Sequence, residues 1–188
     1  MAKRLFLGIK IQVEEKLLGV LNEIKISLKD DYIKWVEMNN LHLTLLFLGD
    51  TNEEFMPGIV ESLKEIENKI SDFKVLLKNI GVFKNIYHPR VIWIGIEPVE
   101  NIQKLKTEID NVISSIGFNI KAEERFHPHL TIGRTKSIKD ASKLKSIIDS
   151  YKGVQLQEAD ITNFQLFESK LTPTGPVYSI IREYSLTN

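Results

Sequence analysis

The chain has 188 residues, which is enough for one domain, or for two small lobes packed as one, with a sizeable core. Its 25 basic and 25 acidic residues balance, so no long-range attraction draws it to polyanions, and a nucleic-acid partner would need a local patch. It contains no cysteine, which excludes disulfides, thiolate nucleophiles and cysteine-based zinc sites.

The first half of the chain predicts strands and helices in alternation. Its opening strand is a continuous apolar run typical of a buried strand, and its first helix has apolar residues on one face. A capping signal at Thr51 or Asn52 opens a second helix that ends near Ile70. The predicted strands are 4–10, 32–36, 41–48 and 73–83, and the first helix is 13–28.

The second half repeats this order. Pro98 opens its first helix and Gly117 closes it. The turn-forming run 171–176 predicts a closing hairpin whose returning strand is 177–186. The other predicted strands are 91–96, a strand around His129, and one or two strands within 154–168; the helices are 98–116 and 137–150, and 118–125 is a connection.

Two short motifs share the core His-Leu-Thr. His42-Leu43-Thr44 lies in the first half, and His129-Leu130-Thr131 follows 87 positions later. The apolar runs 5–9 and 92–96, each with a central glycine, are also 87 positions apart. A single motif of this kind is more often structural. Here, however, two motifs follow two similar apolar runs, and both pairs are separated by 87 positions, which predicts an internal duplication.

The duplication defines the expected domain organisation. We expect a single bilobal domain over 1–188, with approximate half-units 4–83 and 91–168. No linker or low-complexity segment separates the halves, so the lobes should pack together. Each half-unit then brings one histidine and one threonine to a shared cleft.

The motif spacing has a direct chemical meaning. Residues i and i+2 share a face of a strand, so His42 projects with Thr44, and His129 with Thr131. An imidazole exchanges protons near neutral pH, and a hydroxyl donates a hydrogen bond to an oxyanion. Two such pairs suit in-line displacement at phosphorus, which needs a base, an acid and fixed donors. We expect no metal and no cofactor; the near symmetry of the repeat leaves the acid and the base unassigned.

Other residues are weaker candidates. His127 shares a face with His129, so a His-x-His metal pair is the alternative to a structural or supporting role. Arg134 would face away from His129 by strict alternation, but it follows Gly133 at an expected strand end, where the chain can turn. A patch that binds phosphate could include Lys10, Lys34 and Lys136, although each lysine is more usually an ordinary surface residue. Base stacking could involve Trp35 and Trp93, although a core role is more usual for both. His88 is expected in a solvated loop.

These motifs resemble those of the two-histidine (2H) phosphoesterase superfamily, which carries two His-x-Thr-x motifs, here 42–45 and 129–132. Within it the chain is most similar to the RNA 2′,3′-cyclic phosphodiesterases, also called 2′-5′ RNA ligases. The likeness runs from Arg4 to about Tyr178 and includes the flanking runs Trp35-Val36, Phe47-Leu48-Gly49 and Phe126-His127-Pro128.

The resemblance implies an α+β bilobal pseudo-twofold fold, in which two antiparallel sheets line a central cleft and the helices lie outside. It implies metal- and ATP-independent hydrolysis of an RNA 2′,3′-cyclic phosphate to a 2′-phosphomonoester, with 2′-5′ RNA ligation as a reverse activity. His42 would be the general acid and His129 the general base. Thr44, Thr131 and Arg134 would bind the phosphate.

Two alternatives remain open at this point. One is a phosphodiesterase for a small cyclic nucleotide or a 2′-5′ oligonucleotide, and the other is a non-catalytic module that binds RNA ends. The expected partner is RNA with a 2′,3′-cyclic phosphate, with tRNA halves as one candidate. No stretch approaches the ~20 apolar residues of a membrane span, and Met1–Arg4 leads straight into a strand, so a cytoplasmic monomer without a membrane partner is expected.

Overall fold

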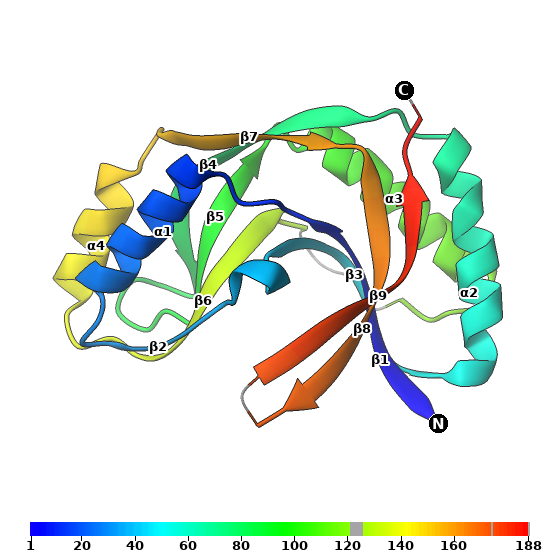
Figure 1. The fold of residues 1–188 in the computed structure, drawn as a ribbon, viewed down its shortest axis with the longest axis horizontal. Coiled ribbons are helices and arrows are strands. Elements are labelled where there is room, and N and C mark those ends of the chain that lie inside the picture. The colour runs from blue at the N-terminus through cyan, green and yellow to red at the C-terminus, as the bar shows by residue number, and fades with distance from the viewer. Residues whose placement is uncertain (121–125, 174, 188) are drawn as a thin grey trace.

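The computed structural model describes residues 1–120, 126–173 and 175–187, and it confirms the predicted α+β fold (Figure 1). The α-helices are α1 (Glu15–Ser27), α2 (Met56–Ser62), α3 (Glu100–Ser115) and α4 (Ala141–Ser150), with short 3-10 helices at Met38–Asn40, Glu53–Phe55 and Leu63–Asn68. The strands are β1 (Ala2–Lys10), β2 (Tyr32–Trp35), β3 (His42–Asn52), β4 (Phe73–Phe83), β5 (Val91–Glu97), β6 (His129–Ser137), β7 (Gln155–Ile161), β8 (Asn163–Thr172) and β9 (Gly175–Ser185). None of the described helices is both long and apolar enough to cross a membrane.

The described strands form one sheet in the order β7-β4-β5-β6-β3-β1-β8-β9, with β2 also paired to β6. Every pairing between these strands is antiparallel. The sheet is narrowest between β3 and β6, where Leu43 and Leu130 form the paired position. This junction separates a first lobe (β3, β1, β8 and β9) from a second lobe (β6, β5, β4, β7 and β2). The two sheets that were predicted are therefore the two parts of one continuous sheet.

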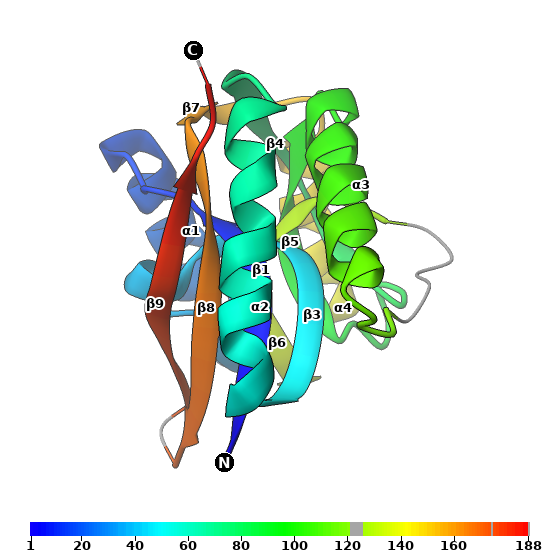
Figure 2. The same ribbon diagram turned by 90° about the vertical axis from the view of Figure 1, so that its right-hand side faces the viewer.

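Each lobe combines elements from both halves of the sequence. β4, from the first half, pairs with β5 and β7 in the second lobe, whereas β8, from the second half, pairs with β1 in the first lobe. Helices α2 and α3 lie side by side outside the first lobe, and α1 and α4 cover the second lobe (Figures 1 and 2). Neither half of the chain therefore holds a complete lobe.

The second predicted helix begins at Glu53 as a 3-10 turn and becomes α-helical only at Met56. Asn52 occupies the N-cap position, but its side chain makes no capping hydrogen bond, and Thr51 is not the cap. β3 continues through Asn52, because Thr51 and Asn52 pair with Lys3 and Ala2 of β1. The Thr51 side chain is buried, which suits a strand and not an exposed helix cap. Only the middle of the predicted helix is α-helical, with 3-10 turns on both sides.

A second predicted helix start is displaced for the same reason. β6 continues to Ser137, which pairs with Tyr32, so α4 begins at Ala141. Asp140 caps α4, since its side chain accepts hydrogen bonds from the backbone N–H groups of Ser142 and Lys143. Residues 121–125 of the predicted connection and Thr174 of the predicted hairpin turn lie outside the described residues.

The motif strands alternate between the core and the cleft face, as their spacing predicts. Leu43 and Leu130 are buried in one continuous apolar cluster that extends through both lobes. The burial pattern along β3 and β6 leaves the two histidines and two threonines half-exposed. The apolar half of each motif thus anchors the strand, and the polar half faces away from the core.

Candidate active site

The two motif strands meet at the centre of both motifs. Leu43 of β3 pairs with Leu130 of β6 in antiparallel register. One step along each strand the side chains point to the opposite face, so this register sets His42 across from Thr131 and Thr44 across from His129. The junction of the lobes therefore gathers both imidazoles and both hydroxyls around one point.

Each catalytic candidate histidine is held by the same backbone contact. His42 Nδ1 lies 2.6 Å from the carbonyl oxygen of Asn40, and His129 Nδ1 lies 2.7 Å from the carbonyl oxygen of His127. A carbonyl oxygen only accepts, so Nδ1 is the donor in both rings. In the neutral imidazole this leaves Nε2 unprotonated and available to a substrate.

Burial lowers the pKa of both imidazoles below the ordinary value of 6.5. For His42, the Asn40 carbonyl partly offsets this effect, and the charges of Arg134 and His129 add to it. For His129, the His127 carbonyl offsets burial, and the charges of His127 and Arg134 lower the pKa further. Burial therefore favours the neutral form of both rings in the free protein.

The two threonine hydroxyls have no partner within the part of the chain that the structure describes. Thr44 and Thr131 are half-exposed, and neither side chain forms a hydrogen bond with a described residue. Each lies one alternation step from a histidine on the same strand face. They are free to donate to an anion that sits between the strands.

A β-bulge brings Arg134 to the same face, which corrects the expectation based on strict alternation. Ile92 pairs with Gly133 but Trp93 pairs with Thr131, so Ile132 is an extra residue in β6. The bulge shifts the alternation by one and returns Arg134 to the face of Thr131. The strand does not end there, because β6 continues to Ser137. Arg134 is exposed, and its charge acts on both imidazoles.

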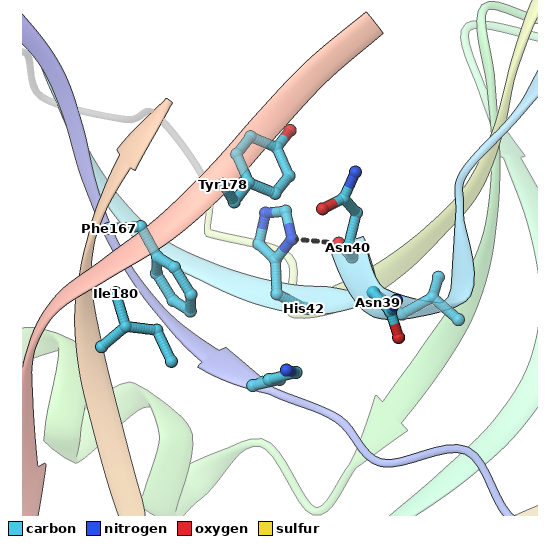
Figure 3. A pocket seen from close by; sticks show the side chains of 8 residues that line it. Asn39, Asn40, His42, Phe167, Tyr178 and Ile180 are labelled. Atoms are coloured by element: carbon cyan, nitrogen blue, oxygen red, sulfur yellow. Dashed lines mark hydrogen bonds between the residues drawn. The ribbon is translucent and has the colours of Figure 1, made fainter. Parts of the chain in front are cut away.

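Aromatic side chains surround His42. The ring centroids of Phe6, Tyr178 and Phe167 lie 4.8, 5.1 and 6.1 Å from that of His42. A cavity of about 180 Å³ opens beside this ring (Figure 3). Its lining comes from β1, β3, β8, β9 and the 3-10 helix before β3: Lys10, Asn39, Asn40, Leu41, His42, Phe167, Tyr178 and Ile180.

The surroundings of His129 are different. Phe83 packs edge-on against it at 4.6 Å, and the exposed His127 ring lies at 6.5 Å. His127 also packs on Trp93. The Trp93 indole covers Gly81 so closely that a Cβ added to this glycine would stand 2.3 Å from the ring. Within the described residues no three His, Asp or Glu side chains are grouped closely enough to hold a metal ion.

The remaining sequence candidates are dispersed. Lys10 lines the cavity, and Lys34 Nζ lies at the tip of the β8–β9 hairpin, 3.0 Å from where a Cβ on Gly175 would stand. Lys136 is exposed on β6, and Trp35 packs on Gly133. His88 is exposed in its loop, as predicted, and its backbone N–H donates to Asn85 Oδ1.

Sequence reasoning missed the residues that support His42. Asn40 was interpreted only as a turn, yet its carbonyl holds His42 and its side-chain Nδ2 donates to the Pro176 carbonyl at 3.1 Å. Phe6 comes from β1, whereas Phe167 and Tyr178 come from the β8–β9 hairpin at the other end of the sequence. The doubled Asn39-Asn40 immediately before the motif was the local signal that was available.

Comparisons with known proteins agree on one family. The model described as LigT like Phosphoesterase matches residues 7–93 and 94–178, so each match contains one motif. An RNA 2′,3′-cyclic phosphodiesterase of Methanocaldococcus jannaschii is 41% identical over 184 residues, 96% of this chain and 99% of that protein. One from Thermotoga maritima is 36% identical over 177 residues, 93% and 92% of the two chains. The crystal structure of TT0787 of Thermus thermophilus matches with a TM-score of 0.79 and 27% identity, over 97% of both chains.

Proposed function

Because the chain belongs to the LigT-like phosphoesterase family, we propose that it hydrolyses RNA 2′,3′-cyclic phosphate ends to 2′-phosphomonoesters without a metal ion or ATP. The observation that carries this proposal is the junction of β3 and β6. Two imidazoles and two threonine hydroxyls meet there around the pair Leu43–Leu130, and among the described residues neither the Nε2 atoms nor the hydroxyls have a hydrogen-bond partner. In-line displacement at phosphorus needs these four groups.

In the proposed reaction, His129 activates water and His42 releases the ribose oxygen. His129 Nε2 accepts a proton as the water oxygen bonds to phosphorus. The bond between phosphorus and O3′ breaks on the opposite side, and the Nε2–H of protonated His42 gives its proton to O3′. The product is a 2′-phosphomonoester with a free 3′-hydroxyl, and solvent exchange restores the two histidines.

The phosphate is held from the same face. Thr44 and Thr131 donate hydrogen bonds to the two non-bridging oxygens, whose charge grows in the transition state. Arg134 supplies a permanent positive charge beside them and stabilises that charge further. These groups sit on two paired strands of a packed sheet, so they need no reorganisation when the substrate binds.

The surroundings of the two histidines support this assignment of roles. Burial and the Arg134 charge lower the pKa of both histidines, and the His127 charge acts in addition on His129, which favours a neutral base. His42 lies deeper, where a bound anionic phosphate raises its pKa and supplies the protonated acid. The neutral state of the free protein is therefore compatible with an acid that forms on binding.

The proposal is tested with a short RNA that ends in a 2′,3′-cyclic phosphate, incubated with the protein in excess chelator. The parent should give a 2′-phosphate end, and His42→Ala and His129→Ala should each lower kcat by ~10²-fold or more. His88→Ala is the matched control, because His88 is exposed in a loop and contacts neither motif. A 3′-phosphate product would overturn the leaving-group assignment, and no product at all would overturn the activity.

A 5′-hydroxyl of a second RNA in place of water gives 2′-5′ joining at the same site. The same transfer of protons then forms a 2′-5′ phosphodiester and frees O3′. The test adds an acceptor RNA with a 5′-hydroxyl to the assay above and looks for a joined product that resists enzymes specific for 3′-5′ links. Release of the 2′-phosphate end alone would limit the activity to hydrolysis.

The setting of the reaction is part of the proposal. We place the enzyme in the cytoplasm as a monomer that acts on RNA ends such as those of tRNA halves. The mass of the protein in solution, measured by light scattering, checks the first part, since a monomer has 21.6 kDa. Sequencing of cyclic-phosphate RNA ends from cells with and without the gene checks the second.

A further inference from the structure

The nucleophile approaches phosphorus from the side of His129 in the proposed reaction. In-line displacement places it opposite the leaving O3′, which His42 protonates. Water needs no binding surface there, but an RNA 5′-hydroxyl is carried by a ribose, a base and a phosphodiester, which must lie on the same side as His129. This step rests on the proposed function, in which His129 is the base and joining uses the same site. The surface around His129 therefore decides whether an RNA end can replace water.

A row of four paired residues crosses the second lobe through β2, β6, β5 and β4 (Figure 1). Lys34 of β2 pairs with Arg134 of β6. In the neighbouring strands, Arg134 pairs with Val91 of β5, and Val91 pairs with Phe83 of β4. Directly paired residues share a face of a sheet, so these four side chains project together. None of the four is buried, whereas Ile92 on the opposite face is fully buried in the core.

Three aromatic rings connect this row to His129. Phe83 packs edge-on against His129, with ring centroids 4.6 Å apart, and His127 lies 6.5 Å from His129 with an interplanar angle of 25°. Trp93 lies 5.1 Å from His127 and 5.4 Å from Phe83. The His127 ring is exposed, and its nitrogens have no hydrogen-bond partner among the described residues. Phe83, Trp93 and His127, here called the second-lobe platform, therefore offer a nucleobase an aromatic stacking surface beside His129.

The second-lobe platform is held in place before any ligand binds. The Trp93 indole lies so close to Gly81 that a side chain at this position would displace the ring. His127 precedes the buried Pro128, which restricts the backbone of His127 to extended conformations. The His127 carbonyl also accepts the hydrogen bond from His129 Nδ1. A surface fixed in this way loses little conformational entropy when it binds a ligand.

Two cations lie on the same face as the second-lobe platform. Lys34 and Arg134 are exposed, and neither forms an ion pair with an acidic residue in the part of the chain that the structure describes. Arg134 serves the reacting phosphate in the proposed function, which leaves Lys34 for a neighbouring phosphate. Aromatic rings beside unpaired cations are the means by which proteins hold single-stranded nucleic acid.

We propose that the second-lobe platform and Lys34 bind the acceptor RNA in 2′-5′ joining. The 5′-terminal base stacks on His127, the 5′-hydroxyl lies at His129 Nε2, and the first phosphodiester binds Lys34. His129 takes the proton of the 5′-hydroxyl as O5′ bonds to phosphorus. The bond between phosphorus and O3′ breaks, and His42 gives its proton to O3′. The acceptor thus binds before it reacts, and its affinity decides how well joining competes with hydrolysis.

The test measures the ratio of joined to hydrolysed product in one reaction, at an acceptor concentration below saturation. Water and the acceptor use the same base, so a variant that only disturbs His129 lowers both products and keeps the ratio. His127→Ala should lower the ratio by about 5- to 150-fold, the scale of one base–aromatic stack. His127→Phe should keep most of it, since a ring remains. With the parent, an acceptor that lacks its first base should give a similarly low ratio.

Lys34→Ala tests the phosphate contact separately. It should lower the ratio for acceptor RNA and make the ratio less sensitive to salt, because one ionic contact is lost. The acceptor 2′,3′-dideoxyadenosine has a 5′-hydroxyl but no phosphodiester, so the parent and Lys34→Ala should join it equally well. His88→Ala and Lys104→Ala are the matched controls, because His88 is exposed in the loop between β4 and β5 and Lys104 is exposed on α3. Both should keep the ratio of the parent.

Two results would overturn the acceptor site while the hydrolytic activity stands. One is hydrolysis without any joined product at every acceptor concentration. The other is an unchanged ratio in His127→Ala, which would show that His127 acts only on His129.

If the parent neither hydrolyses nor joins, the proposed function fails and binding decides the acceptor site. Fluorescence anisotropy then measures the affinity of the parent and of His127→Ala for a short single-stranded RNA with a 5′-hydroxyl and a label at its 3′ end. Weaker binding by His127→Ala than by the parent and His88→Ala supports the site. Equal affinity of the three proteins overturns it.

Discussion

His42 and His129 have the same local support and different neighbours. Each donates Nδ1–H to the carbonyl two residues earlier, and each precedes a threonine at i+2. Each strand also carries a bulge just after the motif, at Leu45 and at Ile132. The contacts within their own strands therefore do not distinguish the two histidines that we propose as proton-transfer groups.

The neighbouring side chains remove this equivalence. Phe47 pairs with Phe6 in the first lobe at the position where Arg134 pairs with Val91 in the second. Tyr178 packs on His42, whereas the second lobe presents His127 beside His129. The first lobe is therefore aromatic and enclosed, and the second is cationic and open. A duplicated motif thus supplies two similar imidazoles, and the side chains around each imidazole determine which one suits the acid and which one suits the base.

The strongest test of this division changes the leaving atom. In a substrate whose O3′ is replaced by sulfur, the sulfur departs readily as a thiolate without receiving a proton. Hydrolysis of this substrate therefore needs no general acid. His42→Ala, which should lose ~10²-fold or more on the oxygen substrate, should recover most of its rate on the sulfur substrate. His129→Ala should stay slow on both. If the rate on the sulfur substrate recovered in His129→Ala instead, His129 would be the acid and His42 the base.

A second test uses the equivalent positions Arg134 and Phe47. Arg134→Ala should lower kcat/KM by roughly 10- to 100-fold, because a charge-assisted contact to phosphate is lost. Phe47→Ala should lower kcat/KM for a mononucleotide cyclic phosphate less than Arg134→Ala does, because the exposed Phe47 ring carries no charge that could bind the phosphate. Steady-state kinetics on both variants measures these changes. Equal losses of kcat/KM in Arg134→Ala and Phe47→Ala would contradict the difference that we infer between the two lobes.

The pH dependence provides a third test. The reaction needs His129 neutral and His42 protonated, and burial lowers the pKa of both below 6.5 in the free protein. The profile of kcat/KM should therefore be bell-shaped with its maximum below pH 6.5, and should fall about tenfold per pH unit on its outer limbs. The acid limb reports protonation of the base, and the alkaline limb reports loss of the proton from the acid.

Arg134→Ala sharpens this pH test. After burial, the Arg134 charge is one of the causes that lower the pKa of both imidazoles, so its removal should move the maximum toward higher pH. Removing the charge of the distant, exposed Lys152 in Lys152→Ala should leave the maximum in place. A maximum that stays fixed in Arg134→Ala would show that the arginine does not reach the histidines.

The smallest effect is expected at two glycines, Gly8 and Gly95, which hold equivalent positions in the sequence repeat but not in the structure. Gly8 faces Thr44, but Trp93, and not Gly95, faces Thr131. An added Cβ at Gly8 would stand 2.7 Å from the Leu43 carbonyl oxygen, inside the motif, and at Gly95 it would stand 2.8 Å from that of Lys78. Gly8→Ala and Gly95→Ala should each lower the free energy of unfolding by ~1–3 kcal/mol, and only Gly8→Ala should also lower kcat. Urea unfolding and kinetics of the folded variants check this, and equal kcat values would contradict it.

The sequence was most informative where one strand decides the outcome. The alternation of His42, Leu43 and Thr44 predicted which side chains enter the core and which stay partly exposed, and the burial pattern confirms it. It was least informative at strand ends and bulges. Strict alternation assigned Arg134 to the wrong face because a bulge depends on how β6 pairs with β5, and pairing is not a property of either strand alone.

The motifs, their duplicated spacing and the α+β class were determined by the sequence itself, because they follow from residue types and from periodicities within single elements. The tertiary structure alone decided that β4 and β8 cross between the lobes, that β3 and β6 meet at Leu43 and Leu130, and that Tyr178 lies against His42. These contacts join residues from distant parts of the chain. They are set by which apolar surfaces can be buried together, and local patterns do not encode that choice.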